Sequence, residues 1–406
     1  MKIRAITAFA ELHIDRTETT LARAGAFLAG ATHAFQQAGV VVQSRRVATQ
    51  SFARLDPRHG PVGIPTLAAR LRETAVAYGI DYLSLGPVGA GDDPDYVDAL
   101  PDIFQAAEGV FASVEIANVE QGIDLALLRH VARSIQAISR VSPDGLSNLY
   151  FAAIANVEPG SPFFPAAYHS GGPTTFALAI EAADLAIQAF ENAESPDEAR
   201  QRLTDLINGA AQQMRPIAER LSAEYSFSFS GLDFSLAPYP GESSSLAGAM
   251  ERLGTTAGSA GMVGAASLVM NAIEAATFPR CGFSGLMLPV LEDSVLGRRA
   301  AEGVLHINDL LLYSAICGTG LDCIPLPGDV SEAALAGILL DVAALSLRLD
   351  KPLTARLMPL PGKVTGDVVA FPAFEYFVPS RVMAAPAGLA SGALGSDGIF
   401  NIMPRP

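Results

Sequence analysis

The feature that most constrains this fold is the alternation of apolar runs and helical runs through the first half of the chain. Apolar runs typical of strands lie at residues 3–9, 40–47, 82–85, 110–116 and 149–154. Helices are expected between them at residues 17–39, 65–78, 95–107 and 124–140. Gly39 and Gly79 end two of these helices, because glycine takes the left-handed conformation without strain. Alternating strands and helices predict parallel strands joined by right-handed crossovers.

The second half continues with both kinds of element. Helices are expected at residues 174–193, 196–224, 243–253, 262–276, 306–317 and 332–349, and strands at residues 225–237, 285–290, 321–326 and 354–360. About ten strands with helices between them predict an α/β fold and favour a large α/β barrel with outer helices over an open sheet. The pattern itself leaves closure of the barrel open. We expect one barrel domain over residues 1–382 and an irregular tail, rich in Ala, Gly and Pro, over residues 383–406.

The charge balance excludes two classes of partner. The chain carries 42 acidic and 27 basic residues, for a net charge of −15. Such a surface repels phosphate backbones and anionic lipid, so we expect no nucleic acid and no membrane partner. No apolar run reaches the roughly 18 residues that a membrane helix needs, and the apolar run at the N-terminus is too short for a signal peptide. Three cysteines, Cys281, Cys317 and Cys323, are too few for a disulfide framework, so a cytoplasmic protein is expected.

Four stretches of sequence are typical of one family. Residues 317–329 read Cys-Gly-Thr-Gly-Leu-Asp-Cys-Ile-Pro-Leu-Pro-Gly-Asp, and residues 360–367 read Leu-Pro-Gly-Lys-Val-Thr-Gly-Asp. Residues 231–238 read Gly-Leu-Asp-Phe-Ser-Leu-Ala-Pro, and residues 289–293 read Pro-Val-Leu-Glu-Asp. Through these stretches the chain resembles, from its first strand to about Val382, the uncharacterised bacterial and archaeal family called domain of unknown function 711.

This resemblance implies a fold similar to that of the pyruvate formate-lyase-like glycyl-radical enzymes, a ten-stranded α/β barrel with its site inside the mouth. It does not imply their chemistry. Those enzymes carry an Arg-Val-x-Gly-Tyr type loop near the C-terminus, whereas residues 393–400 here read Ala-Leu-Gly-Ser-Asp-Gly-Ile-Phe. We therefore expect no radical mechanism, and the resemblance supplies no catalytic residues.

The first group of candidate site residues begins with Asp233. This residue lies inside an apolar strand, where a charge is costly unless it is paired or used. The next loop contains Glu242, Ser243 and Ser244 at the expected start of a helix, where backbone N–H groups and hydroxyls can bind an anion. The alternative is that one serine only caps the helix. Asp233 is a catalytic candidate, and Glu242, Ser243 and Ser244 are candidates for substrate binding.

A second group of acids follows later apolar runs. Glu292 and Asp293 lie directly after the run 286–291, at the carboxyl end of an expected parallel strand, where α/β folds usually place their chemistry. With Asp233 they can bind a divalent cation or divide acid and base roles; alternatively, Asp293 only caps a helix. Asp322 follows two glycines that let backbone approach a ligand. Glu292 and Asp322 are catalytic candidates, and Asp233, Glu292 and Asp293 are the candidate metal ligands.

Two histidines are further candidates. His169 lies in an apolar loop just before Gly171 and Gly172, which lead into the helix expected from residue 174. A histidine there can act as an acid or base near neutral pH, and the alternative is a structural histidine bonded beneath the loop. His13 follows the first strand, again at a strand end. His169 is a catalytic candidate, whereas Gly171, Gly172 and His13 are candidates for substrate binding.

These patterns favour an enzyme that acts on a small-molecule ligand by non-radical acid–base or metal-assisted chemistry, of hydrolase or lyase type. A binding or sensor protein without turnover is the alternative, and an assembly protein is a third. No Walker pattern and no G-x-G-x-x-G pattern occurs, so no nucleotide cofactor is expected. Small residues over 258–276 allow close helix packing and predict a homo-oligomer, a dimer in the simplest case, unless that helix packs within the chain.

Overall fold

A computed structural model describes residues 1–405 as a mixed α/β protein with a mostly parallel central sheet. The first group of parallel strands is β1 (Lys2–Phe9), β2 (Arg45–Ser51), β3 (Tyr82–Val88), β4 (Val110–Asn118) and β6 (Phe151–Ala155). The second group is β7 (Thr175–Glu181), β8 (Ser228–Ala237), β9 (Gly320–Pro327) and β10 (Leu353–Leu360). The two groups run in opposite directions, because β7 pairs antiparallel with β1 and β10 pairs antiparallel with β6.

The first group confirms the parallel strands predicted from the alternation in the first half, although β2 begins at Arg45, whereas its strand was expected at residues 40–47. Parallel strands covered on both faces are nearly continuous apolar runs. All five residues of β6 are buried, and so are the last five of β1. Their burial on both faces explains why the strand pattern here is a solid apolar block rather than an alternation of apolar and polar residues.

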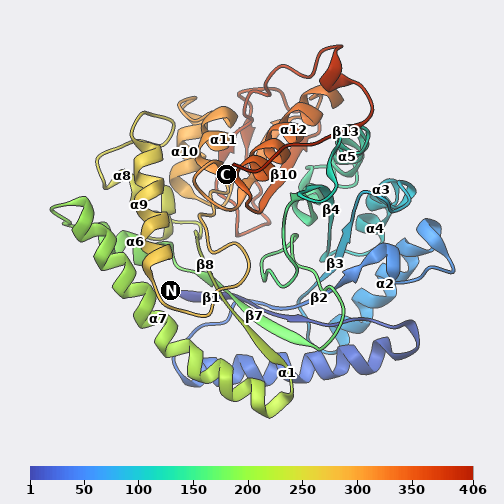
Figure 1. Cartoon of the computed structure of the whole chain (residues 1–406), viewed down its shortest axis with the longest axis horizontal. Coiled ribbons are helices and arrows are strands. Elements are labelled where there is room, and N and C mark those ends of the chain that lie inside the picture. Colours follow the sequence, from blue (N-terminus) through green and yellow to red (C-terminus); the bar gives the residue numbers. More distant parts are fainter. Residues whose placement is uncertain (406) are drawn as a thin grey trace.

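Helices lie around the outer side of the sheet, as Figure 1 shows. They are α1 (Thr17–Gln37), α2 (Gly60–Ala77), α3 (Asp95–Asp98), α4 (Leu100–Ala106), α5 (Leu125–Ile138), α6 (Ala183–Phe190), α7 (Pro196–Tyr225), α8 (Leu246–Glu251), α9 (Met262–Ala275), α10 (Ser294–Ala301), α11 (Ile307–Ser314) and α12 (Glu332–Leu349). Gly39 and Gly79 follow α1 and α2 with φ angles of 78° and 71°, which confirms both predicted helix ends. Ser195 caps α7 by accepting a hydrogen bond from the N–H of Glu198.

The prediction of one helix was wrong. Residues 174–193 were expected to be helical throughout, but Thr175–Glu181 form β7, and α6 begins at Ala183. A short apolar run such as Phe176–Ile180 fits a buried strand and a buried helix equally well by its periodicity. Hydrogen bonds to β1 on one side and β8 on the other decide in favour of the strand.

The strand expected at residues 285–290 is not a regular strand, although this segment lies between β8 and β9. Its Met287 N–H donates to Ser235 O of β8 at 3.0 Å, and its Val290 N–H donates to Asp322 O of β9 at 3.1 Å. Upstream, the Leu232 N–H of β8 donates to Pro279 O at 2.8 Å. Scattered bonds of this kind connect the segment to both neighbours without forming a continuous ladder.

The connection between β6 and β7, residues 156–174, enters the inner side of the sheet, and we call it the interior loop. Thr7 Oγ1 of β1 donates to Pro162 O, and Ser84 Oγ of β3 donates to Ala167 O, both at 2.8 Å. The loop thereby satisfies polar side chains that point inward from two strands, and most of its apolar residues are buried.

The C-terminal tail packs along the outside of the chain. Its β13 (Ile399–Phe400) pairs with β5 (Gly122–Asp124), which in turn pairs with the end of β4. A second small sheet joins β11 (Val368–Val369) and β12 (Ser380–Arg381) just before the tail. Over residues 383–405 the tail is mostly irregular, and residue 406 lies outside the described residues.

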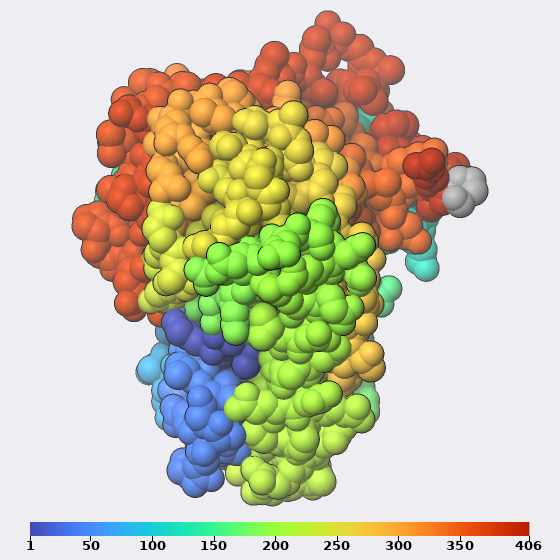
Figure 2. Space-filling model, turned by 90° about the vertical axis from the view of Figure 1, so that its left-hand side faces the viewer, coloured from blue at the N-terminus to red at the C-terminus, as the bar shows by residue number. Residues whose placement is uncertain are grey.

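Helix α9, in the stretch that predicted association, packs within the chain against α7, α8 and α11. Figure 2 shows α7 (green) running across this face of the molecule, beneath the region of α8 and α9 (yellow). The small residues Ala265, Ala266 and Ala272 of α9 are buried. Across residues 1–405, none of the helices combines the length and the hydropathy needed to cross a membrane.

Candidate functional site

A cavity of about 1560 Å³ lies on the inner side of the sheet. Its walls include the amino ends of the first strand group, at Arg4, Arg46, Tyr82, Phe111 and Tyr150. Exposed residues such as Gln36, Val76, Asp144 and Glu375 belong to its rim, so the cavity reaches the surface.

The position of the cavity follows from the two opposite strand directions. Sequence reasoning expected chemistry at the carboxyl ends of parallel strands, but the interior loop occupies that end of β1 and β2, where it bonds to Thr7 and to Thr49 O. The cavity therefore meets the first strand group at its amino ends. It meets the second group at Ala237, the carboxyl end of β8. It also meets Glu292, which follows the irregular segment of residues 279–290 between β8 and β9.

Two carboxylates that were predicted separately, Glu292 and Asp322, meet in the cavity through Arg356 of β10. The Arg356 Nε atom donates to Asp322 Oδ1 at 2.5 Å, and its Nη2 atom donates to Glu292 Oε1 at 3.3 Å. Arg4 of β1 donates to the other Glu292 oxygen, Oε2. Glu292 is thus held between two guanidinium groups, whereas Asp322 Oδ2 has no hydrogen-bond partner among residues 1–405.

Both arginines remain charged in spite of their burial. Burial disfavours the charged form of Arg356, but Asp322, Cys323 and Glu292 outweigh burial and hold its pKa above the usual value. Burial also disfavours the charged form of Arg4, but Glu292 and Glu181 outweigh burial and raise the pKa of Arg4 above its usual value. The buried charges are therefore paired, which is the condition for tolerating them in the interior.

Cys323 completes the one cluster of metal-ligand type found among residues 1–405. Its Sγ atom and one oxygen each of Glu292 and Asp322 lie within 4.8 Å of one another. The thiol donates to Glu292 Oε1 at 3.5 Å, and burial raises its pKa well above the usual value, so it stays protonated. Since Arg356 already bridges the two carboxylates, this donor set fits a guanidinium better than a second cation.

Sequence reasoning missed Arg46, the second residue of β2. Its Nε atom donates to Ser44 Oγ at 2.9 Å. Its Cζ atom lies 5.6 Å from the ring centroid of Tyr82 and 5.1 Å from that of Phe164. Burial, with Arg4 as the next cause, lowers the pKa of Arg46 to about 9. Arg46 lies near the end of the apolar run 40–47, and a charged residue at that place was its only sequence signal.

Asp233 does not line this cavity. Its side chain is fully buried in β8 and accepts hydrogen bonds from Ser235 Oγ at 2.5 Å, from the Phe283 N–H at 2.8 Å and from the Ser284 N–H at 2.9 Å. These bonds attach the irregular segment 279–290 to β8. The Asp233 carboxylate thus connects β8 to this segment, and both of them contribute residues to the cavity wall.

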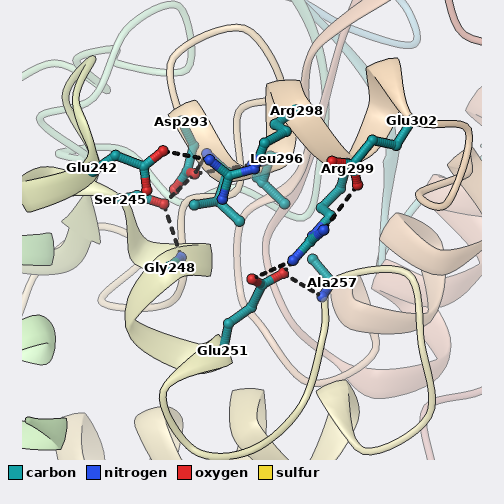
Figure 3. A network of polar contacts seen from close by, with 11 residues as sticks. Glu242, Ser245, Gly248, Glu251, Ala257, Asp293, Leu296, Arg298, Arg299 and Glu302 are labelled. Atoms are coloured by element: carbon teal, nitrogen blue, oxygen red, sulfur yellow. Dashed lines mark hydrogen bonds and ion pairs between the residues drawn. The ribbon is translucent and has the colours of Figure 1, made fainter.

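Asp293 and Glu242 lie in a separate polar network, drawn in Figure 3. The buried Asp293 caps α10 by accepting from the N–H groups of Val295 and Leu296, and it also accepts from Ser245 Oγ at 2.5 Å. The expected alternative, helix capping, is the arrangement observed for Asp293. The structure does not bring Asp233, Glu292 and Asp293 together as a metal site, since Glu292 alone of the three lines the cavity.

The loop candidates around Glu242 also lie away from the cavity. Glu242 is exposed and pairs with Arg298 at 2.5 Å. Ser243 and Ser244 belong to a short 3-10 turn, and it is Ser245 that caps α8, by accepting from the Gly248 N–H at 2.8 Å. The expected helix over 243–253 is thus shorter and begins later.

His169 lies in the interior loop at the opposite end from the cavity lining. It is buried, its N–H donates to Thr49 O at 2.9 Å, and its Nε2 atom has no hydrogen-bond partner among residues 1–405. Gly171 and Gly172 follow with φ angles of 97° and 91° and lead into β7 rather than a helix. His13 is exposed, with its Nε2 atom 3.9 Å from Glu11 Oε1. None of these four residues lines the cavity.

The fold and the site together define a class: mixed α/β proteins whose mostly parallel sheet carries a large cavity with paired arginines and carboxylates. The chain belongs to the family described as Uncharacterised ACR (DUF711), whose family model matches residues 1–379. This confirms the family resemblance found in the sequence.

Relatives in several microorganisms share most of the chain. A UPF0210 protein of Pyrobaculum arsenaticum is 30% identical over 342 residues, which are 80% of this chain and 75% of the relative. UPF0210 protein MK1214 of Methanopyrus kandleri is 29% identical over 379 residues, covering 88% and 83%. A UPF0210 protein of Neisseria gonorrhoeae is 25% identical over 377 residues, covering 89% and 83%.

Proposed function

We propose that the protein is an enzyme that acts on a small molecule in this cavity by non-radical acid–base chemistry. The observation that carries the proposal is the environment of Asp322. Its Oδ1 atom is bound by Arg356 at 2.5 Å, its Oδ2 atom is without a hydrogen-bond partner among residues 1–405, and the side chain lines the cavity. A carboxylate held in one orientation with one free oxygen is suited to act as a general base.

The tyrosines of the cavity supply the complementary acid. Burial raises the pKa of Tyr150 to about 12 and also raises that of Tyr82, so both phenols are protonated at neutral pH. A phenol can donate a hydrogen bond or a proton to an oxygen on which negative charge develops. A base and an acid of this kind suit hydrolase or lyase chemistry. His169 and Asp233 take no part in this chemistry, because neither lines the cavity.

Turnover tests the proposal directly. The purified chain is incubated with panels of carboxylic esters, phosphate esters and hydroxy acids, and products are identified by mass spectrometry. We expect at least one class to react, and Asp322→Asn to slow the reaction by about 100-fold or more. Glu219→Gln, an exposed change on α7 that also removes one acid, is the matched control and should keep the wild-type rate.

Two outcomes would contradict or revise the proposal. An Asp322→Asn variant as active as the wild type would reject Asp322 as the base. Loss of activity with EDTA, restored by added Mg²⁺ or Zn²⁺, would favour the metal-assisted version, in which Glu292 and Asp322 are the available ligands in the cavity.

A binding or sensor protein without turnover is the second candidate. The hydrogen bonds of Glu292 favour this candidate, because Arg4 and Arg356 bind both oxygens of Glu292. Asp322 is then the one carboxylate of the pair with an oxygen that has no hydrogen bond among residues 1–405. A cavity that only binds needs donors and an apolar wall, with no free base. Ligand binding without product in any panel would support this candidate.

We also propose that the sheet closes as a ten-membered barrel similar to that of the pyruvate formate-lyase-like enzymes. The hydrogen bonds from the segment 279–290 to both β8 and β9 support closure. Gly395 and Gly398 lie in the exposed tail beside β13, away from the cavity lining, which supports chemistry without a glycyl radical. A cytoplasmic location and a homo-oligomer complete the proposal, and light scattering over a range of concentrations tests the latter.

A further inference from the structure

We propose that the cavity recognises its small molecule through an anionic group, a carboxylate or a phosphate, which binds to the guanidinium of Arg46. This inference rests on the cavity of the proposed function and names the class of ligand for it. It holds for a binding protein as well as for an enzyme, so its test is one of binding.

Each of the other arginines of the cavity has a protein acceptor. Arg4 and Arg356 pair with buried carboxylates, and Arg45 pairs with Asp81 at 3.2 Å. Arg72 donates from Nε to the backbone O of Glu108 at 2.7 Å. Each of these groups has a structural partner.

Arg46 differs from all of them. Among residues 1–405, its one side-chain hydrogen bond is that from Nε to Ser44 Oγ, and no carboxylate lies within ion-pair distance. The two Nη atoms therefore carry four N–H groups without a protein acceptor, on a side chain that lines the cavity. A planar pair of donors of this kind matches the two oxygens of a carboxylate or phosphate.

The electrostatic environment favours the same ligand. Arg46 is half-buried, and burial disfavours its charged form, as do Arg4 and Arg356. These effects outweigh the opposing ones of Tyr82 and Glu292, so the pKa of Arg46 is lowered. An anion bound to Arg46 would compensate for both effects, since it supplies the missing opposite charge in a region of low dielectric constant.

The walls indicate what the anion is attached to. Tyr82 and Phe164 flank the guanidinium, and Phe111, Phe371 and Phe374 line the same cavity. Aromatic walls bind apolar or planar groups by offset or edge-to-face contacts. The ligand class is therefore a small organic anion with an apolar or aromatic body, rather than a free inorganic ion alone.

The experiment measures anion binding by thermal shift and calorimetry in a chloride buffer. The probes are benzoate, phenyl phosphate and inorganic phosphate, with benzyl alcohol as the neutral counterpart. Arg46→Gln removes the proposed contact, and Arg46→Lys keeps the charge without the paired donors. Arg215→Gln, an exposed change on α7 that removes the same charge, is the matched control.

We expect benzoate or phenyl phosphate to raise the Tm of the wild type and of Arg215→Gln, with benzyl alcohol having no effect. Arg46→Gln should bind the same anion about 30-fold more weakly or not at all, and Arg46→Lys should lie between. The preferred probe distinguishes a carboxylate from a phosphate ligand. Preference for inorganic phosphate over both organic anions would contradict the assigned apolar body.

Without ligand, Arg46→Gln should melt at the same temperature as the wild type or higher, because it removes a desolvated and unpaired charge. A melting temperature several degrees lower would show a structural arginine and overturn the proposal. So would equal anion affinity in the wild type and Arg46→Gln, or no binding of any probe at millimolar concentration. Anion binding without turnover of any substrate panel would leave this inference standing and reject only the proposed enzymatic function.

Discussion

The Nη2 atom of Arg356 lies 3.3 Å from the Oε1 atom of Glu292, although 64 residues separate them in the sequence. The same guanidinium binds Asp322, and Glu292 in turn binds Arg4, so three segments of the chain meet at one carboxylate. Charges this deeply buried are stable only as a set, because each one depends on the others for its compensation.

We expect Arg356→Met to lower the free energy of unfolding by about 3 kcal/mol, since it leaves Asp322 and one side of Glu292 uncompensated in the interior. The measurement is urea denaturation at neutral pH. Arg133→Met, which breaks the more exposed pair with Glu332, is the control and should cost less than about 1 kcal/mol. Equal losses in the two variants would mean that the buried pair contributes no more than a surface pair.

Asp293→Ala should cost about 3 kcal/mol of stability. It removes a helix cap, and it leaves Ser245 Oγ and the N–H of Ala247 without their buried acceptor. Asp124→Ala, at the less buried cap of α5, is the matched control and should cost about 1 kcal/mol. The difference is measured by chemical denaturation with EDTA present and absent. A cost of Asp293→Ala that disappears in the presence of EDTA would support the hypothesis that Asp293 is a metal ligand.

Asp233 should make the protein less stable as pH rises through the acid range. Burial raises its pKa to about 6 from 3.8, although Ser235 and the Phe283 and Ser284 N–H groups act in the opposite sense. Between these values the unfolded chain releases a proton that the folded chain keeps, so this contribution to stability falls with rising pH and levels off above about 6. In Asp233→Asn that slope should vanish. Identical pH profiles for the two proteins would contradict the raised pKa.

His169 should produce the opposite dependence. Burial lowers its pKa below the usual 6.5, against the effects of the Gly172 backbone and Glu11. The unfolded chain then takes up a proton first, so the contribution to stability is full above pH 6.5 and is lost as pH falls toward the lower pKa of the folded state. His169→Asn should lose less stability on acidification, as measured by denaturant unfolding at several pH values. Parallel losses would indicate that other groups carry the effect.

The local rules of the sequence were enough for much of the secondary structure. Gly39 and Gly79 end helices, and the apolar runs of the first half form parallel strands, because periodicity and capping depend on residues a few positions apart. The same rules failed at Phe176–Ile180, where a buried strand and a buried helix share one apolar pattern.

The candidate site was predictable only in part. Glu292 and Asp322 were found because acids after apolar strands are unusual, and both line the cavity. Asp293 shared that signal. It lies one residue after Glu292 in the same turn, but its side chain points away from the cavity and caps α10. Sequence reasoning cannot distinguish these neighbours, because the direction of each side chain depends on how the segment 279–290 lies against β8 and β9.

By itself, then, the sequence determined the family, the acidic surface, most helices and the parallel strands of the first half. Tertiary structure alone decided that the second strand group runs in the opposite direction and that the interior loop occupies one end of the sheet. It also decided that Arg46 is left without a carboxylate partner among residues 1–405. The reason is physical: burial and charge pairing join residues such as Arg4 and Glu292, 288 positions apart, and no local pattern contains both.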